Sequence, residues 1–330
     1  IPRVSRALAV AVLSNIEARV LACLAGEAWL MAAFWEGKDP YMVVAQKIFG
    51  PTTSWPMEGV KKIGKHPYRQ VGKVVLLGSG YGMGIPKFTL YSAGMGIDLD
   101  AVGTSAKECI ITYRRLHPAI AGDEAGEYKG TPYFRNGFWH KLNDAALEAT
   151  RNKNVALVGR CAFEFDKKHL CLVLPSQRRI VYRNARVAHV VPSYAKGTGK
   201  TVEAVQYYSP RFGWKSLYGG SICENLCQGV ARDFMAYGLC QVEAAGMPVV
   251  FHVHDEGGAD TENLGHFMEC FTTCPSWAPD FPLDAEGGLL RRYSKSVDPQ
   301  RRLGPAGWEE SEDTVGEVVY RNGKPLEETR

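Results

Sequence analysis

The segment AVAVLSNIEAR, Ala9 to Arg19, passes from one kind of secondary structure to another with almost no intervening loop. Its apolar start favours a β-strand as far as Leu13, and Ser14-Asn15 interrupts that pattern. From Ile16 to Phe34 the apolar residues recur at helical spacing. The only carboxylate near this joint between strand and helix is that of Glu17. Such a joint is a place where many enzymes present side chains to a substrate.

The composition is that of a soluble globular protein. The 330 residues suffice for one large or two ordinary domains, with 45% hydrophobic and 22% charged residues. No run of 18 apolar residues occurs, so we expect no membrane span. We also expect no signal peptide, because Ile1 suggests a start inside a longer reading frame and the first apolar stretch continues into the helical pattern.

Nine cysteines are scattered along the chain, and none forms a CxxC pair. Cys223/Cys227 and Cys270/Cys274 are each four residues apart, but no histidine pair at finger-like spacing accompanies them, which argues against zinc. Reduced thiols in a cytoplasmic protein are the better explanation.

The net charge of +4 is mild, yet the basic residues cluster. A solvated face is the ordinary explanation of such clusters, whereas their position beside glycine-rich segments favours a polyanionic partner. The two clusters are Lys61, Lys62, Lys65, His66, Arg69 and Lys73, and Arg178, Arg179, Arg183 and Arg186.

Further along the chain, periodicity and turn residues predict alternating helices and strands. Asn225–Ala245 is the strongest helix, closed by Gly246. A strand over Val249–Glu256 is expected to bend at Gly257-Gly258, and residues past Ser296 are expected to form a loosely held polar tail. The other expected elements are helices over Tyr41–Phe49, Pro67–Gly80, Cys109–Leu116 and Phe138–Thr150, a surface insertion over Ala121–Gly137, and strands within Cys161–Val191 with LPSQRR as a turn.

The segment HPYRQVGKVVLLGSGYG carries two cations, an apolar residue and an aromatic ring at intervals of four residues. Arg69, Lys73, Leu77 and Tyr81 therefore share one broad face of the expected helix. Such a face suits a nucleoside triphosphate, with the phosphates on the cations and the sugar and base towards the ring. The alternative is an exposed amphipathic helix with an ordinary pair of cations.

The segment PVVFHVHDEGG places His254, Asp255 and Glu256 at the end of an expected strand. Adjacent acidic residues at such a place are costly unless a cation or strong donors are present. A divalent metal that polarises a phosphoryl oxygen is the natural partner, and a charged hairpin tip is the alternative. No GxSxG motif occurs, which argues against a Ser-His-Asp hydrolase.

Together these segments resemble the family A DNA polymerases, most closely the phage-type members. Arg69-x3-Lys73-x7-Tyr81-Gly82 is similar to the fingers-helix motif, and His254-Asp255-Glu256 to the palm hairpin motif. LSNIEARVLACLAGE resembles the strand-to-helix palm motif. ENLCQGVARD resembles the helix before the hairpin, and LPSQRRIVYRNAR a segment common in phage members. The motifs occur in the family's order from about Ala9 to Ser296.

The resemblance implies a role for each matching residue in the transfer of a nucleotide to a primer. Asp255 would hold the metals, with Glu256 and His254 beside it, and Lys73 would be a candidate proton donor to pyrophosphate. Arg69 and Lys73 would bind the triphosphate. The other implied nucleotide-binding residues are Leu77, Tyr81, Tyr41, which supports the phosphates, and Glu17, which lies under the sugar; Gln228, Arg178 and Arg179 are the expected DNA-binding residues.

Three positions depart from the family pattern. Val12 stands where the family has a metal-binding aspartate, and no other acidic residue lies between Ile1 and Asn15. Two Mg²⁺ ions normally need two bridging carboxylates, so with Asp255 alone we expect chemistry to fall by orders of magnitude. Leu77 replaces a frequent Phe or Tyr, and His252 a frequent Gln.

The resemblance implies an α+β fold in which a palm with an antiparallel sheet is interrupted by mainly helical fingers. We expect the palm at residues 1–27 and 216–296, the fingers at 28–215 with the insertion near 121–137, and the tail at 297–330. No thumb or exonuclease domain is expected in this chain, which reads as a piece that is truncated, encoded in two parts or incompletely recorded.

The expected function is template-directed DNA synthesis from dNTPs on primer-template DNA with two Mg²⁺ ions, in the cytoplasm of the host if the chain is phage-encoded. An upstream fragment carrying the thumb and exonuclease regions is a possible partner, and no membrane is expected to be one. A non-catalytic DNA- or nucleotide-binding relic of a polymerase is the alternative, because of Val12 and the missing thumb. A nucleotide-binding enzyme unrelated to polymerases would lack salt-dependent DNA affinity.

Overall fold

The computed structural model describes residues 7–57, 63–128, 130–192, 197, 199–290, 293, 314–321 and 324–325. The chain divides into two compact units, the first formed by residues 1–17 and 230–330 and the second by residues 18–229. The expected subdomain boundaries, after residue 27 and before residue 216, differ from these. Two helices cross from one unit into the other, namely α1 (Ile16–Ala25) and α9 (Gly219–Ala244).

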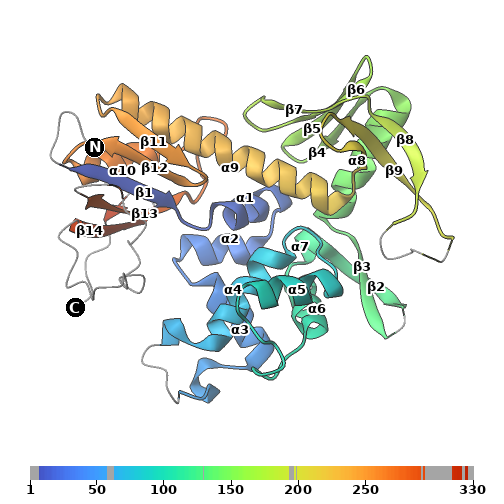
Figure 1. Ribbon diagram of the computed structural model, residues 1–330, viewed down its shortest axis with the longest axis horizontal. Coiled ribbons are helices and arrows are strands. Elements are labelled where there is room, and N and C mark those ends of the chain that lie inside the picture. The colour runs from blue at the N-terminus through green and yellow to red at the C-terminus, as the bar shows by residue number, and fades with distance from the viewer. Residues whose placement is uncertain are drawn as a thin grey trace. The chain divides into compact units, whose positions relative to one another are not determined.

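The first unit is built on a six-stranded antiparallel sheet in the order β11-β12-β1-β13-β14-β15 (Figure 1). The apolar segment at the start of the chain forms β1 (Leu8–Leu13), which confirms the strand expected there. It lies between β12 (Glu256–Asp260) and β13 (Asp284–Leu290). The other strands are β11 (Val249–Val253), β14 (Thr314–Arg321) and β15 (Lys324–Pro325).

Helix α10 (Leu264–Phe271) packs on this sheet so closely that glycines are required beneath it. A Cβ atom added at Gly287 would lie 2.7 Å from the Met268 sulfur, and one added at Gly257 would lie 2.8 Å from the Phe271 ring. The core of the unit is completed by rings such as Phe234 and Phe281, whose centroids are 4.2 Å apart. These contacts fix β12 and β13 on either side of β1.

The expected bend at Gly257-Gly258 was wrong. Both glycines lie inside β12, paired with β1, and the chain turns at His254-Asp255 instead, where His254 adopts a φ of 54°. The glycines are needed for packing rather than for turning, because a Cβ atom at Gly258 would lie 2.3 Å from the Phe251 ring. The acidic residues are therefore at the turn itself.

The C-terminal segment is not the loosely held tail that its polar composition predicted. Residues 314–321 form β14, which pairs along the full length of β13. The remainder of the expected tail lies outside the described residues. Pairing with a buried strand gives this segment a place in the sheet that its own sequence does not indicate.

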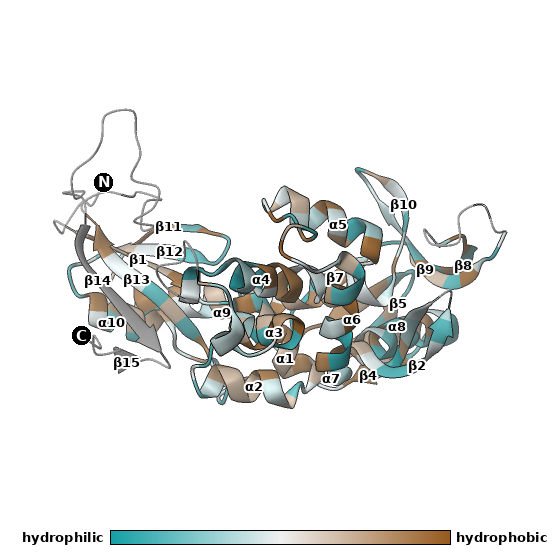
Figure 2. Ribbon diagram, turned by 90° about the horizontal axis from the view of Figure 1, so that it is seen from below, coloured by the Kyte–Doolittle hydropathy of each residue, from teal (hydrophilic) through white to brown (hydrophobic). Residues whose placement is uncertain are grey.

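The second unit begins with helices, each of which buries one face. Figure 2 shows hydrophobic and hydrophilic residues side by side around them. The helix expected over Ile16–Phe34 is broken at Gly26-Glu27, where Gly26 has a φ of 72°. The helices are α1, α2 (Ala28–Trp35), α3 (Pro40–Phe49), α4 (Pro67–Ser79), α5 (Ile85–Gly94), α6 (Ala106–Leu116), α7 (Pro118–Ala121) and α8 (Phe138–Asn152), with short 3₁₀ helices η1 (Thr52–Ser54) and η2 (Ile63–Lys65).

The expected surface insertion forms a hairpin of β2 (Gly122–Tyr128) and β3 (Thr131–Asn136), and all of β2 beyond its first residue is exposed. Two further sheets follow the hairpin, and the strands expected within Cys161–Val191 form part of them. Helix α8 packs against strands of both (Figure 1). One sheet has the order β4-β5-β6-β7 (Val155–Val158, Cys161–Asp166, His169–Val173, Arg179–Tyr182) and the other β10-β9-β8 (Gly213–Ser216, Val202–Ser209, Arg186–Val190).

None of the helices in the described part of the chain combines the length and apolar composition that a membrane crossing requires. All nine cysteines are free thiols. Burial raises the pKa of several of them, to about 12 for Cys161 and about 11 for Cys109. Cys161 and Cys109 therefore stay protonated at neutral pH and act as small apolar side chains.

Candidate functional site

Each unit carries its own group of candidate residues. In the second unit these are Asp39, Tyr41, Arg69 and Lys73, which we call the α4 site. The Arg69 Nε atom donates to Asp39 Oδ2 at 2.5 Å, and Asp39 also accepts from the backbone N–H of Tyr41 at 3.0 Å. One carboxylate therefore caps helix α3 and orients the arginine of helix α4.

The ring of Tyr41 lies beneath both cations of the α4 site. Its centroid is 5.3 Å from the Arg69 guanidinium carbon and 6.0 Å from the Lys73 nitrogen. Tyr41 is buried, and this burial is the main cause that raises its pKa to about 12, so its hydroxyl stays protonated. The residue that the resemblance implied as a support for phosphates thus contacts both expected phosphate-binding cations.

Gly72 explains why helices α3 and α4 approach so closely. A Cβ atom added there would lie 2.1 Å from the backbone oxygen of Tyr41 and 3.1 Å from the backbone nitrogen of Ala45. Only glycine permits this approach without moving one helix. Neither Gly72 nor Asp39 was expected as a site residue, although an aspartate before Pro40 is a recognisable helix-capping signal.

The expected face of α4 exists over most of its length. Arg69, Lys73 and Leu77 are half-buried, while Val71, Val74, Val75, Leu76 and Gly78 on the other faces are buried. Tyr81 does not share that face as expected, because the helix ends at Ser79 and Tyr81 lies in the turn that follows. In the part of the chain that the structure describes, Lys73 has no carboxylate partner, and its charge is available to an anion.

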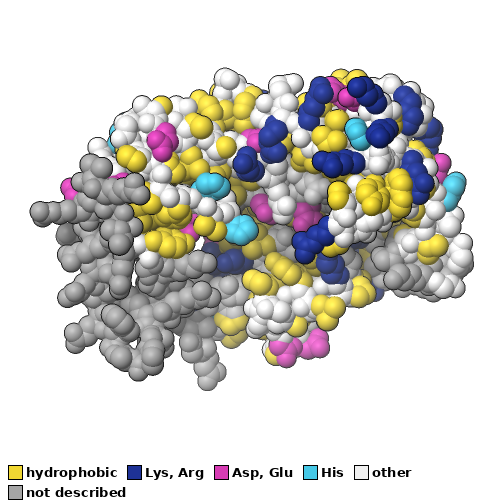
Figure 3. Space-filling model, turned by 45° about the horizontal axis from the view of Figure 1, so that its top comes forward, with side chains coloured by type: hydrophobic (Ala, Val, Ile, Leu, Met, Phe, Trp, Pro, Cys, Tyr) yellow, Lys and Arg dark blue, Asp and Glu magenta, His cyan; other side chains and the backbone are white. Residues whose placement is uncertain are grey.

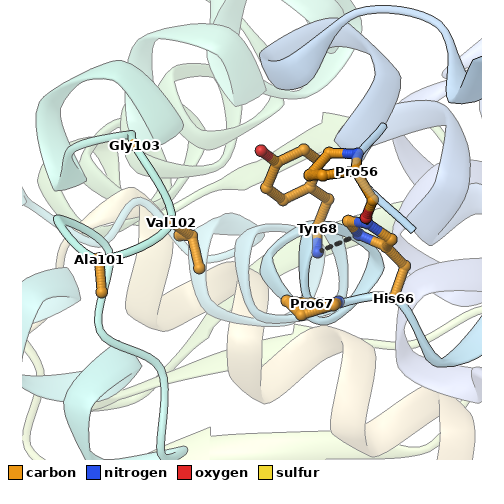
Figure 4. Close-up of a pocket in the computed structure, with 7 residues that line it drawn as sticks. All are labelled: Pro56, His66, Pro67, Tyr68, Ala101, Val102 and Gly103. Carbon is orange, nitrogen blue, oxygen red and sulfur yellow. Dashed lines mark hydrogen bonds between the residues drawn. The ribbon is translucent and has the colours of Figure 1, made fainter. Parts of the chain in front are cut away.

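The N-terminus of α4 is fixed by His66, which was expected only as part of a basic cluster. Its Nδ1 accepts from the backbone N–H of Tyr68 at 3.1 Å, and its Nε2 donates to the oxygen of Pro56 at 2.8 Å. His66 is buried and therefore has a structural role. With Pro56, Pro67 and Tyr68 it lines one side of an open pocket of about 550 Å³, and Ala101, Val102 and Gly103 line the other (Figure 4). Lys61 and Lys62 of the same cluster lie outside the described residues.

In the first unit the candidate residues surround the turn between β11 and β12. Strand pairing places Glu256 directly opposite Val12, and Val12 directly opposite Glu286 on its other side. Residues paired in this way point to the same face of a sheet, so an exposed Val12 stands between two glutamates. We call this group, with Asp255, the β1 site. The end of β1 is joined to the turn because Leu13 N–H donates to the Asp255 oxygen at 2.8 Å.

The donor set of the β1 site does not fit the two-ion centre that the resemblance implies. The described residues contain no group of three or more His, Cys, Asp or Glu side chains that could hold a metal ion. Glu256 is engaged by the Tyr293 hydroxyl, which donates to its Oε2 at 2.8 Å. His254 is exposed, and valine offers no ligand atom. We therefore assign no step of a reaction to a metal bound by this chain.

Glu17 lies in the first turn of α1, where a negative charge is favoured by the helix dipole. Gln228 is exposed on α9. The two arginines expected to bind DNA have partners inside the second unit, since Arg178 Nη2 donates to the Gly229 oxygen at 2.7 Å and Arg179 pairs with Glu164 at 2.7 Å. Arg178 thereby ties the turn after β6 to α9, while Arg179 remains half-exposed.

No protein-family model matches the chain. The chain is 31% identical over 291 residues to the DNA polymerase of Bacillus phage SP02, which covers 86% of this chain and 40% of that protein. It thus spans less than half the length of this relative. It is also similar to the solved POL domain of Pol1 from M. smegmatis, in complex with DNA primer-template and dNTP, with a TM-score of 0.47, 18% identity, and coverage of 86% of this chain and 39% of that one.

Proposed function

We propose that this chain is the palm and fingers portion of a family A DNA polymerase and that it serves in template-directed DNA synthesis, because its motifs resemble those of that family and its sequence is similar to a phage DNA polymerase. Its substrates are dNTPs, and its partner is primer-template DNA. In this role the second unit binds the triphosphate, and the first unit carries what remains of the acidic centre. An upstream segment or fragment that supplies the rest of the polymerase completes the machinery, and the reduced thiols suit the cytoplasm.

The observation that supports the proposal most directly is the construction of the α4 site. Arg69 and Lys73 lie one turn apart over the same ring, and Arg69 is held by a carboxylate that is itself fixed as a helix cap. Two preorganised cations on one helix face recognise the phosphates of a nucleotide, because their orientation costs little further entropy on binding. An ordinary amphipathic helix would not need this framework.

We propose that the chain binds dNTP through Arg69, Lys73 and Tyr41, with Leu77 and Tyr81 towards the sugar and base and Glu17 limiting the 2′ position. Lys73 is the residue we propose as proton donor to pyrophosphate. Gln228 and Arg179 are proposed to contact DNA.

The second candidate function is that of a polymerase segment that binds nucleotide and DNA without catalysis. Val12 between Glu256 and Glu286 favours it, because the family's carboxylate is replaced by an exposed apolar side chain. His254, Asp255 and Glu256 then remain as parts of the turn rather than as working groups.

Primer extension with the purified chain and its Val12→Asp variant tests the proposal. We expect slow extension by the unmodified chain and an acceleration of about 100-fold in the variant, which corresponds to about 2.7 kcal/mol of barrier. Val12→Asn is the matched control, since it has the size of aspartate without the charge. Binding of Mn²⁺, followed by electron paramagnetic resonance, provides a second readout and should tighten only in Val12→Asp.

The outcomes separate the two candidates. If the unmodified chain and Val12→Asp both bind dNTP and primer-template but neither extends a primer, even with a thumb-containing partner supplied, the non-catalytic function holds. If neither protein binds nucleotide or DNA, both candidates are wrong. Rapid extension by the unmodified chain would show that Val12 is not a defect.

A further inference from the structure

The sheet β8-β9-β10 of the second unit carries an exposed group of aromatic and basic side chains. Its members are Arg186, Tyr208, Arg211, Phe212, Trp214 and Lys215, which we call the aromatic platform. The exposed fractions of the three rings are 41% for Tyr208, 60% for Phe212 and 45% for Trp214. Large apolar rings exposed together on a short hairpin are unusual unless they meet a partner.

The strand register arranges part of the platform on one face of the sheet. Trp214 of β10 is paired with Tyr208 of β9, so both rings point to the same side, with centroids 5.8 Å apart and planes at 71°. Arg186 of β8 lies on that side as well, because it pairs with Gln206, two residues before Tyr208.

The side chain of Arg186 lies over the indole of Trp214. Its guanidinium carbon lies 3.9 Å from the centroid of Trp214, and its Nε and Nη2 atoms donate to Gln206 Oε1 at 3.3 and 3.1 Å. Gln206 Nε2 in turn donates to the Ser216 hydroxyl at 3.5 Å. The arginine is therefore oriented by neutral partners and keeps its full charge.

The loop between β9 and β10 also places cations over an aromatic ring. Phe212 has two cations over its ring, with the Arg211 guanidinium carbon at 5.0 Å and the Lys215 nitrogen at 4.4 Å. Within the described residues, neither these two cations nor Arg186 forms an ion pair with a carboxylate. Figure 3 shows Lys and Arg side chains gathered, with hydrophobic ones between them, over the part of the second unit that carries β5–β9.

Cations without a carboxylate partner favour a polyanionic ligand, and exposed aromatic rings favour a ligand with flat apolar groups. Single-stranded nucleic acid offers both, because its bases are free to stack on aromatic rings while its phosphates meet the cations. A duplex offers only phosphates, since its bases already stack on one another. A protein partner would cover the rings but would gain nothing from three uncompensated cations unless it were strongly acidic.

We propose that the aromatic platform binds single-stranded nucleic acid by stacking bases on Trp214 and Phe212 and pairing phosphates with Arg186 and Lys215. That this strand is the unpaired part of a template rests on the proposed function. The affinity for single strands does not, because it requires neither metal nor dNTP.

The test is the binding of a fluorescein-labelled oligothymidine to the full chain, measured by anisotropy without metal or dNTP. Trp214→Ala is expected to weaken binding about tenfold, the loss typical of one base–aromatic stack, and Trp214→Phe by less than about threefold. Arg186→Ala is expected to reduce the salt dependence of the logarithm of affinity by about 0.7, one phosphate contact on a single strand. Trp35→Ala, at a tryptophan of α2 that is 46% exposed, should change nothing.

A second measurement is independent of variant folding. Photocrosslinking of an oligonucleotide containing 5-iododeoxyuridine to the unmodified chain should label a peptide within residues 202–216. The proposal is overturned if Trp214→Ala binds oligothymidine as the unmodified chain does, or if crosslinks map outside that peptide. It is also overturned if Trp214→Ala weakens a blunt duplex equally, or if it only converts a dimer to a monomer. Failure of primer extension alone would leave the platform supported and would count only against the proposed function.

Discussion

The α4 site and the β1 site differ in how their charges are held. In the α4 site, Arg69 has a carboxylate partner and Lys73 lies above a buried ring, so both cations are positioned before any ligand arrives. In the β1 site, Glu256 and Glu286 flank an exposed valine, and the interaction of Glu256 with Tyr293 is a single hydrogen bond at the surface. The α4 site therefore holds its charged side chains by several contacts, whereas the β1 site has an apolar side chain at its centre.

From this difference we infer that the proposed nucleotide binding and the proposed chemistry depend on separate groups of residues in this chain. The residues of the α4 site lie in α3, in its N-cap and in α4, and those of the β1 site lie in β1, β12, β13 and the turn before β12. We infer that a change at position 12 leaves the α4 site as it is.

Gly72→Ala is expected to destabilise the second unit by more than about 3 kcal/mol. The new Cβ atom would lie 2.1 Å from a backbone oxygen, which cannot move without separating α3 from α4, and overpacking of this kind exceeds the usual 1–3 kcal/mol. Chemical unfolding measures the loss, and hydrogen exchange with mass spectrometry assigns it to peptides of residues 18–229.

Gly94→Ala is the matched control for Gly72→Ala, because it lies at the end of helix α5 with no atom within 4 Å of the added Cβ. It should leave stability within about 0.5 kcal/mol. If Gly72→Ala also increases hydrogen exchange throughout β1 and β12, the two frameworks are not separate and the comparison fails.

Acid is expected to destabilise the second unit through His117. Burial lowers the pKa of His117 to about 4, whereas the ordinary value in an unfolded chain is about 6.5. Its Nδ1 donates to the Tyr113 oxygen at 2.7 Å, and its Nε2 has no partner among the described residues. The folded state therefore keeps the neutral form.

Protonation of His117 destabilises the folded state, because its pKa is lower there than in the unfolded chain. Above pH 6.5 the contribution of His117 to stability is complete, and it is lost as the pH falls towards 4, by up to about 3 kcal/mol. Thermal unfolding of the unmodified chain and His117→Asn between pH 7 and 4 measures it, and the variant should show a shallower pH dependence. Equal slopes would contradict the assignment. His266, which is exposed, provides the control variant His266→Asn.

Structural features that depend on neighbouring residues in the sequence could be predicted, whereas features that depend on tertiary packing could not. The ends of α3 and α4 were predictable because Pro40, Pro67 and Gly50 act within one turn. The turn at His254-Asp255 was not, because Gly257 and Gly258 look like turn residues and their real role is to admit the rings of Phe271 and Phe251. That role arises only from tertiary packing.

The site residues divide in the same way. Arg69 and Lys73 were predictable from a spacing of four residues, whereas Asp39, which orients Arg69, is 30 residues away in sequence. Glu286 was not predictable, because its place beside Val12 comes from strand pairing across most of the chain. Tyr81 was misplaced since the helix ends two residues earlier than a continuous face would require.

Lys73→Ala is expected to weaken dNTP binding about tenfold, the effect of one charge-assisted hydrogen bond to phosphate. Isothermal titration measures this tenfold factor in the unmodified chain and again in Val12→Asp, which tests whether the α4 site and the β1 site act independently. Independent frameworks predict the same factor in both, because sites that share no interactions contribute additively. Lys65→Ala is the control, since that lysine is exposed in η2 outside helix α4. A factor that changes more than about threefold between the two backgrounds would couple the sites.

Tyr293→Phe is expected to have the smallest effect, and it acts on the β1 site alone. Removing the hydroxyl frees the Glu256 carboxylate from a hydrogen bond that is exposed to solvent and worth roughly 0.5–1 kcal/mol. The pKa of Tyr293 is raised by this same bond, so its hydroxyl stays protonated and competes with a cation for Glu256 at neutral pH. Mn²⁺ should therefore bind the variant about two- to fivefold more tightly, as measured by electron paramagnetic resonance, whereas Tyr237→Phe in α9 should not differ from the unmodified chain. The gain in Mn²⁺ affinity from freeing Glu256 is limited to one hydrogen bond, so we expect it to be far smaller than the gain from Val12→Asp. If Tyr293→Phe and Val12→Asp tighten Mn²⁺ binding equally, Tyr293 rather than Val12 is the residue that weakens metal binding at this site.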